Sequence, residues 1–156
     1  MCCGVVFAAE KKMDKTKVNQ AVSYFNEGMS CSQAILTAYG QEFGIDRGLS
    51  LKISAPFGGG MARMGETCGA VTGALMVLGL KYATGKDAKD KLFALENEFA
   101  EKFKEHNNSI NCRKLLNCDL ANPEERKVFV EKGLAEKLCR KFVKDAAEIL
   151  EELLQK

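Results

Sequence analysis

Apolar residues recur with the period of an α-helix along almost the whole chain. Stripes of this kind, with spacings of three or four residues, run through segments near both ends and through the middle, for example Leu92, Leu95, Phe99 and Phe103. No segment shows the alternation of apolar and polar residues that is typical of a half-buried β-strand. The pattern therefore predicts an all-α fold, a single-domain bundle of five or six helices.

Capping residues and glycines mark where these helices begin and end. Ser30 and Gln33 have the spacing of a capping box, and Asn122 before Pro123 is a strong start signal. Longer helices are predicted over about 14–27, 30–43, 67–84, 87–106, 123–133 and 134–154. Two short ones are predicted over about 47–54 and, with Ser109 or Asn111 as its cap, up to 116.

The first residues differ from the rest of the chain. Met13 followed by Asp14 resembles a natural start, so we expect residues 1–12 to be a disordered extension and residues 13–156 to be the folded domain. The opening lacks the basic start and long apolar centre of a secretion signal. The apolar run from Cys68 to Leu80 is too short and too rich in glycine to cross a membrane. We therefore expect a cytoplasmic protein without membrane insertion.

Charge and histidine content limit the classes of function. The formal net charge is only +2, and no dense block of Lys and Arg is interleaved with aromatic residues, so nucleic-acid binding is not expected. His106 is the single histidine, which gives little support to acid–base catalysis.

A glycine-rich loop is predicted directly before the central apolar helix. We expect it to let the backbone approach Cys68, while a G-x-x-x-G pattern inside the helix allows close packing against a neighbour. Gly60 and Gly65 have the spacing of a phosphate-binding loop. However, Glu66 occupies the position of the phosphate-binding lysine, and no strand is predicted before the loop, so a nucleotide site is not expected. The supporting glycines are Gly58, Gly59, Gly60, Gly65, Gly69 and Gly73.

The chain contains seven cysteines, which in a reducing compartment indicate metal or redox chemistry more often than structural disulfides. Cys31, Cys68 and Cys112 are predicted at helix starts, where free N–H groups and the helix dipole lower a thiol pKa and stabilise an anionic centre. Cys139 lies inside the last predicted helix and has to reach the others from the side. These four are the candidate ligands, and Cys118 is a candidate substitute ligand or resolving thiol.

Four stretches of the sequence resemble the C_GCAxxG_C_C family of small redox-active proteins. They are the central Cys68-Gly69-Ala70-Val-Thr-Gly73, and Gly28-Met-Ser-Cys31-Ser-Gln-Ala, Asn111-Cys112-Arg-Lys and Cys139-Arg-Lys. That family is described by a Cys-Gly-Ala-x-x-Gly motif and four shared cysteines. The resemblance covers about residues 14–152 and implies that Cys31, Cys68, Cys112 and Cys139 have a redox role. A similar domain is associated with split-Soret cytochromes, for which a non-heme iron–sulfur centre has been proposed.

These observations leave three functions open. The leading hypothesis is electron transfer or redox sensing with a partner protein, through an iron–sulfur cluster held by the four cysteines, [2Fe–2S] rather than [4Fe–4S]. Four thiolates would also suit zinc. The first alternative is a metal-free protein in which a low-pKa Cys68 attacks a disulfide and a second cysteine resolves the product. The second alternative is a helical interaction module in which the cysteines only pack.

Overall fold

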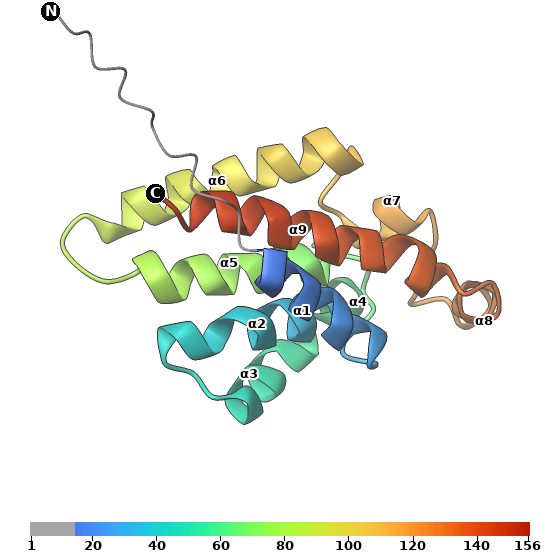
Figure 1. Ribbon diagram of the computed structural model, residues 1–156. Helices are drawn as coiled ribbons and strands as arrows, with labels where there is room; N and C mark the ends of the chain where they lie inside the picture. Colours follow the sequence, from blue (N-terminus) through green and yellow to red (C-terminus); the bar gives the residue numbers. More distant parts are fainter. Residues whose placement is uncertain (1–14) are drawn as a thin grey trace, which may run out of the picture.

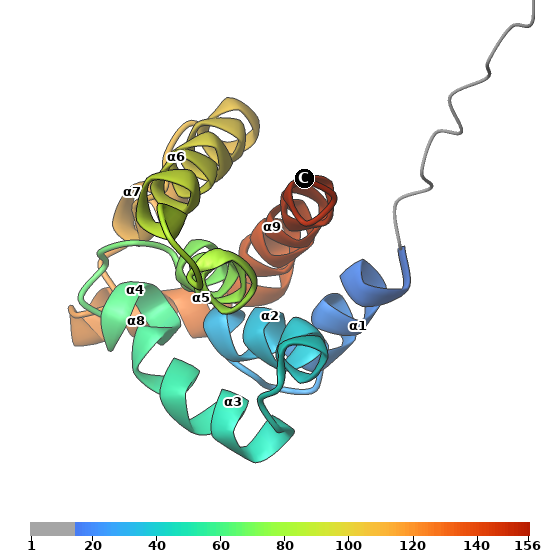
Figure 2. The same cartoon turned by 90° about the vertical axis from the view of Figure 1, so that its left-hand side faces the viewer.

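The computed structural model describes residues 15–156, and five helices form its main bundle (Figure 1). The helix α5 lies at the centre, where it packs against α2, α6 and α9, while α1 packs against α2 and α9. Figure 2 shows these helices nearly end-on. They are α1 (Lys15–Asn26), α2 (Cys31–Tyr39), α5 (Gly69–Tyr82), α6 (Ala88–Asn107) and α9 (Arg140–Leu153).

Shorter elements complete the fold. The helix α3 (Arg47–Ser54) packs against α2, and α4, α7 and α8 lie at one end of the bundle (Figure 1). Two 3₁₀ turns, η1 and η2, connect α2 to α3 and α3 to α4, and a π-helical turn, η3, leads into α9. The bounds are α4 (Gly58–Met61), α7 (Cys112–Leu116), α8 (Pro123–Glu131), η1 (Gly40–Phe43), η2 (Ala55–Phe57) and η3 (Ala135–Cys139).

The predicted all-α fold is confirmed. Residues 15–156 contain six helices of nine or more residues and no strand, and their one antiparallel bridge joins Thr67 to Asn111. The predicted helix 47–54 coincides with α3, and most of the other predicted helices agree with the observed ones to within about two residues. Two differ more: the segment predicted as a helix over 30–43 ends in the 3₁₀ turn η1, and the one predicted over 134–154 begins with the π-helical turn η3. The expected extension, residues 1–12, lies outside the described residues. No helix within residues 15–156 combines the length and the apolar character needed to cross a membrane.

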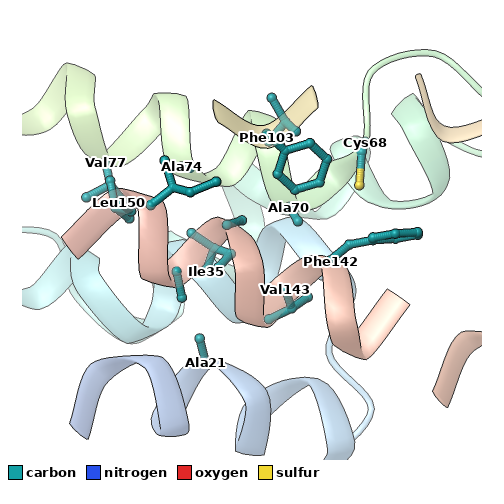
Figure 3. Close-up of a cluster of buried hydrophobic side chains, with 14 of the residues drawn as sticks. Ala21, Ile35, Cys68, Ala70, Ala74, Val77, Phe103, Phe142, Val143 and Leu150 are labelled. Atoms are coloured by element: carbon teal, nitrogen blue, oxygen red, sulfur yellow. The ribbon is translucent and has the colours of Figure 1, made fainter. Parts of the chain in front are cut away.

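The core lies between α5 and its neighbours. Ala70, Ala74 and Val77 of α5 are buried against Phe103 of α6 and Leu150 of α9 (Figure 3). Such burial of large apolar side chains is the main stabilising contribution in a bundle of this size.

The G-x-x-x-G pattern works as predicted, because Gly73 allows α2 to approach α5 closely. A Cβ added at Gly73 would lie 3.0 Å from the Cβ of Ile35 and 3.0 Å from the carbonyl oxygen of Ser32. A side chain at this position would push the two helices apart.

Candidate functional site

The N-terminal ends of three parallel helices meet at one end of the bundle. The helices α2, α5 and α9 run in the same direction, and their first residues lie near α4, α7 and α8 (Figure 1). Cys31 is the first residue of α2, and Cys68 is the N-cap of α5. The positive ends of the helix dipoles therefore point to one region, which favours negative charge there.

A capping box positions Cys31. The backbone N–H of Gln33 donates to Ser30 Oγ (3.4 Å), and the backbone N–H of Ser30 donates to Gln33 Oε1 (3.1 Å). The amide Nε2 of Gln33 also donates to the carbonyl oxygen of Leu51 in α3 (3.0 Å). Because these bonds fix the first turn of α2, they also fix the backbone that carries Cys31.

Backbone hydrogen bonds hold Cys68 and Cys112 on neighbouring segments. The N–H of Cys68 donates to the carbonyl of Ile110 (2.8 Å), and the N–H of Cys112 donates to the carbonyl of Glu66 (2.6 Å). The side chain of Asn111 caps α7 by accepting from the backbone N–H of Lys114 (3.0 Å). Two cysteines that are distant in sequence are thereby brought side by side.

The turn η3 brings Cys139 to the same region. The N–H of Arg140 donates to the carbonyl of Ala135, five residues earlier, which is the bond of a π-helical turn. Such a turn contains more residues than an α-helical turn, so it changes the register of the residues before it relative to α9. Cys139 is its last residue, whereas sequence analysis predicted an uninterrupted α-helix over 134–154.

Cys31, Cys68, Cys112 and Cys139 line a single cavity of about 140 Å³. Cys68 and Cys112 are buried, and Cys31 and Cys139 are partly exposed. Cys68 lies at the edge of the apolar core (Figure 3), and Phe142 lines the same cavity. The other large lining residues are apolar: Phe25, Leu115, Leu116, Leu120, Phe129 and Phe142.

The glycine-rich stretch forms a left-handed turn where a plain loop was expected. Gly59, Gly60, Met61, Ala62 and Arg63 have φ angles from +52° to +68°. For each of the three non-glycine residues this conformation costs about 1–2 kcal/mol. Hydrogen bonds compensate part of this cost, since the carbonyls of Gly58, Gly59 and Gly60 accept from N–H groups further along the turn.

Two of the six supporting glycines, Gly59 and Gly69, line the cavity itself. A Cβ at Gly69 would lie 3.2 Å from the Cβ of Cys31 and 3.0 Å from the carbonyl oxygen of Phe57. The other four glycines allow close approach of residues around the site. A Cβ added to them would meet the side chains of neighbouring residues: Ser30 at Gly58, Cys112 at Gly60, Arg113 at Gly65 and Ile35 at Gly73.

Burial raises the pKa of Cys68 to about 12, although the N–H groups of Ala70 and Val71 favour its thiolate. Burial likewise raises the pKa of Cys112 to about 12, and repulsion from Cys68, Cys139 and Cys118 adds to this shift. The expectation that a helix start lowers the thiol pKa is therefore wrong for these two residues, because the loss of solvation outweighs the helix dipole.

Cys31 and Cys139 form a hydrogen-bonded thiol pair. Accepting this bond lowers the pKa of Cys139, against an opposing effect of burial. The same bond, burial and the neighbouring thiols raise the pKa of Cys31. The thiol that ionises first is therefore Cys139, and the prediction that Cys68 has the low pKa is wrong.

Cys118 does not line the cavity. Its sulfur lies 3.7 Å from the carbonyl oxygen of Glu125, and it faces a separate surface hollow of about 460 Å³ beside α7 and α8. Leu116 and Phe129 line both spaces and so separate Cys118 from the other four thiols. The structure gives Cys118 no place as a substitute ligand.

Within residues 15–156, no three side chains of His, Cys, Asp or Glu are close enough together to hold a single metal ion. The four cysteines are thus arranged around a cavity and not around one point.

Most of the apolar lining of the site was not predicted from the sequence. Phe129 and Leu120 come from the α7–α8 region, and no local pattern distinguishes them from ordinary core residues.

Comparison with known families gives one match. The family described as "Putative redox-active protein (C_GCAxxG_C_C)" matches residues 29–153, a range that includes all four cavity cysteines. Comparisons with curated proteins and with solved structures give no significant match.

Proposed function

Because the chain belongs to the C_GCAxxG_C_C family of redox-active proteins, we propose that its four cavity cysteines hold an iron–sulfur cluster for electron transfer or redox sensing. The observation that carries this proposal is the single cavity lined by Cys31, Cys68, Cys112 and Cys139. Four cysteine thiolates are the usual ligands of both [2Fe–2S] and [4Fe–4S] clusters.

The cavity suits a compact inorganic group. Its volume is about 140 Å³, and apart from the four thiols and Ser30 its lining is apolar. The small volume favours [2Fe–2S] over [4Fe–4S]. In a cluster with two irons each iron takes two cysteines, and the hydrogen-bonded Cys31 and Cys139 are suited to be one such pair.

The surroundings favour negative charge. The starts of α2 and α5 direct N–H groups and positive dipole ends toward this region, which would stabilise an anionic cluster and thiolate ligands. When bound, the cluster would supply one-electron transfer, and the apolar lining would influence its potential by limiting access of water. The partner would be another redox protein, and the cytoplasm is the proposed location.

The test is an ultraviolet–visible spectrum of anaerobically purified protein, with iron and acid-labile sulfide measured on the same sample. We expect charge-transfer bands between about 300 and 600 nm and equal amounts of iron and sulfide. Cys31→Ser, Cys68→Ser, Cys112→Ser and Cys139→Ser should each weaken or abolish the bands and leave helix content nearly unchanged.

Cys118→Ser is the matched control, because Cys118 is also a free thiol of this region but does not line the cavity. This variant should keep the full spectrum. A protein that stays colourless and free of iron after cluster reconstitution would contradict the proposal, as would equal retention of the cluster in all five variants.

A second function is favoured by one specific observation: Cys31 and Cys139 line the same cavity and are its two partly exposed cysteines. Two thiols in contact, one of them with a lowered pKa, are suited to thiol–disulfide exchange in the metal-free protein. Cys139 would then be the attacking thiol and Cys31 the resolving one. This function predicts reversible formation of a Cys31–Cys139 disulfide, which mass spectrometry of the oxidised protein would detect.

A further inference from the structure

One side of the cysteine cavity lies nearer to solvent than the rest. Cys31 and Cys139 are partly exposed, whereas Cys68 and Cys112 are buried. The surface next to the two exposed cysteines is formed by α1, which packs against α9, and by η3 at the start of α9 (Figure 1). An electron can cross a thin layer of side chains, so a redox partner exchanges electrons most readily across this surface.

A hollow of about 400 Å³ between α1 and α9 gathers positive charge on this surface. Four exposed cations line it together with one carboxylate, that of Asp145. The cations follow one another at positions i, i+3, i+4 and i+7, which lie on the same side of a helix. They are Lys137, Arg140, Lys141 and Lys144.

Two of these cations are available to an external anion. The other two are paired within α9, Lys141 with Asp145 and Lys144 with Glu148. Neither Lys137 nor Arg140 takes part in an ion pair within residues 15–156. Both flank Cys139 in the sequence, so the unpaired positive charge lies beside one of the two exposed cysteines.

The α7–α8 side of the cavity has a different charge. The hollow there borders the cavity through Leu116 and Phe129. Three carboxylates and two ammonium groups line it: Glu124, Glu125, Glu131, Lys127 and Lys132. The excess of cations therefore distinguishes the side formed by α1 and α9.

An apolar hollow of about 540 Å³ lies between these cations and the cysteine cavity. Phe25, Met29 and Ala135 line it, and Phe25 and Ala135 also line the cavity. Arg140 lines both hollows and joins them, and Glu136 is the carboxylate of the apolar one. We call the residues that line the two hollows the α1–α9 face. An apolar centre with a charged rim is the usual composition of a surface that binds another protein.

We propose that a one-electron carrier protein with an acidic surface docks on the α1–α9 face, with its carboxylates on Lys137 and Arg140. The inference rests on the proposed iron–sulfur function and adds the kind of partner and its place. In the exchange the carrier loses one electron and the cluster gains it, and no covalent bond forms or breaks. The apolar centre favours a protein over a nucleic acid or a small anion, because these would use the cations alone.

Flavodoxin, an acidic one-electron carrier, is the probe, and cytochrome c, a basic one, is its counterpart. Each is added to the ¹⁵N-labelled full chain, and the amide signals and the Kd are followed by NMR. We expect flavodoxin to shift the signals of residues 137–144 and of the end of α1. Binding should weaken as NaCl is raised from about 20 to about 200 mM, because salt screens exposed charges. Cytochrome c should leave these signals unchanged.

Lys137→Gln and Arg140→Gln should each raise the Kd for flavodoxin about two- to fivefold, the range of an exposed ion pair. Transfer of an electron from reduced flavodoxin to the cluster, measured by stopped flow at low salt, should slow by a similar factor. Lys86→Gln is the matched control, because Lys86 is an exposed cation after the C-terminal end of α5, whereas Cys68 lies at the other end of that helix. It should change neither quantity.

The possible failures can be told apart. Absence of flavodoxin binding, an effect of Lys86→Gln equal to that of Arg140→Gln, or equal binding of cytochrome c would overturn the docking face, even in a protein that carries its cluster. Binding of a DNA duplex or of pyrophosphate to residues 137–144, without binding of flavodoxin, would overturn the kind of partner. A colourless protein that still binds flavodoxin through Lys137 and Arg140 would overturn the cluster and support the docking face.

Discussion

The backbone of Gly60 packs directly against the side chain of Cys112. A Cβ added at Gly60 would lie 2.6 Å from the Cβ of Cys112 and 2.7 Å from the backbone nitrogen of Glu66. Gly60 also has a φ of +67°, which side-chain-bearing residues rarely adopt. Cys112 can therefore reach its place in the cavity only while residue 60 has no side chain.

Gly60→Ala is accordingly expected to destabilise the fold and to displace Cys112. The left-handed backbone alone costs about 1–2 kcal/mol, and the collision with rigid backbone adds to it. Urea unfolding of the metal-free protein should show a loss of more than about 2 kcal/mol.

Gly79→Ala is the control for this substitution, since Gly79 lies inside α5 and an added Cβ would have no atom from outside the adjacent helix backbone within 4 Å. It should stabilise the protein by about 0.5–1 kcal/mol through helix propensity. Equal effects of the two substitutions would show that contact with Cys112 is not what requires a glycine at position 60.

Ser30→Ala should loosen the start of α2 and with it Cys31. Loss of this N-cap is expected to cost about 1 kcal/mol and to raise amide hydrogen exchange in the first turn of α2. Asp46→Ala removes the same kind of cap from α3, which carries no cysteine. If cap loss near the cavity matters for the site, Ser30→Ala should speed the alkylation of Cys31 and Asp46→Ala should not.

Stability of the metal-free protein should fall as the pH rises above about 9. Burial raises the pKa of both Cys68 and Cys112 from 9.0 to about 12, so between these values the unfolded chain releases protons that the folded chain retains. The free energy of unfolding should fall by up to about 1.4 kcal/mol per pH unit for each thiol. Urea titrations at several pH values should show a shallower fall in Cys68→Ala and Cys112→Ala; an unchanged slope would contradict the burial effect.

Cys139 should be the first of the cavity thiols to react with iodoacetamide as the pH is raised, since its pKa is lowered by the hydrogen bond from Cys31. Cys31→Ala removes that donor, so the alkylation of Cys139 should shift to higher pH. Cys118→Ala serves as the control and should leave the profile of Cys139 unchanged. Mass spectrometry of the labelled peptides measures the order, and reaction of Cys68 before Cys139 would contradict it.

Sequence alone was sufficient to predict the all-α class and most helix boundaries, because these depend on local signals. The apolar stripe Leu95, Phe99 and Phe103 defines the buried face of α6, and the capping box of Ser30 and Gln33 defines the start of α2. The motif from Cys68 to Gly73 likewise identified the family, and the four cysteines of that resemblance are the four found in the cavity.

The tertiary structure was needed for everything that depends on distant parts of the chain meeting. Cys31 and Cys139 are 108 positions apart, and they line the same cavity only because α2 and α9 begin at the same end of the bundle and a π-helical turn precedes Arg140. The thiol pKa values also depend on distant parts of the chain. A helix start is visible in the sequence and lowers a thiol pKa, but the burial that outweighs it at Cys68 is produced by helices packed from elsewhere in the chain.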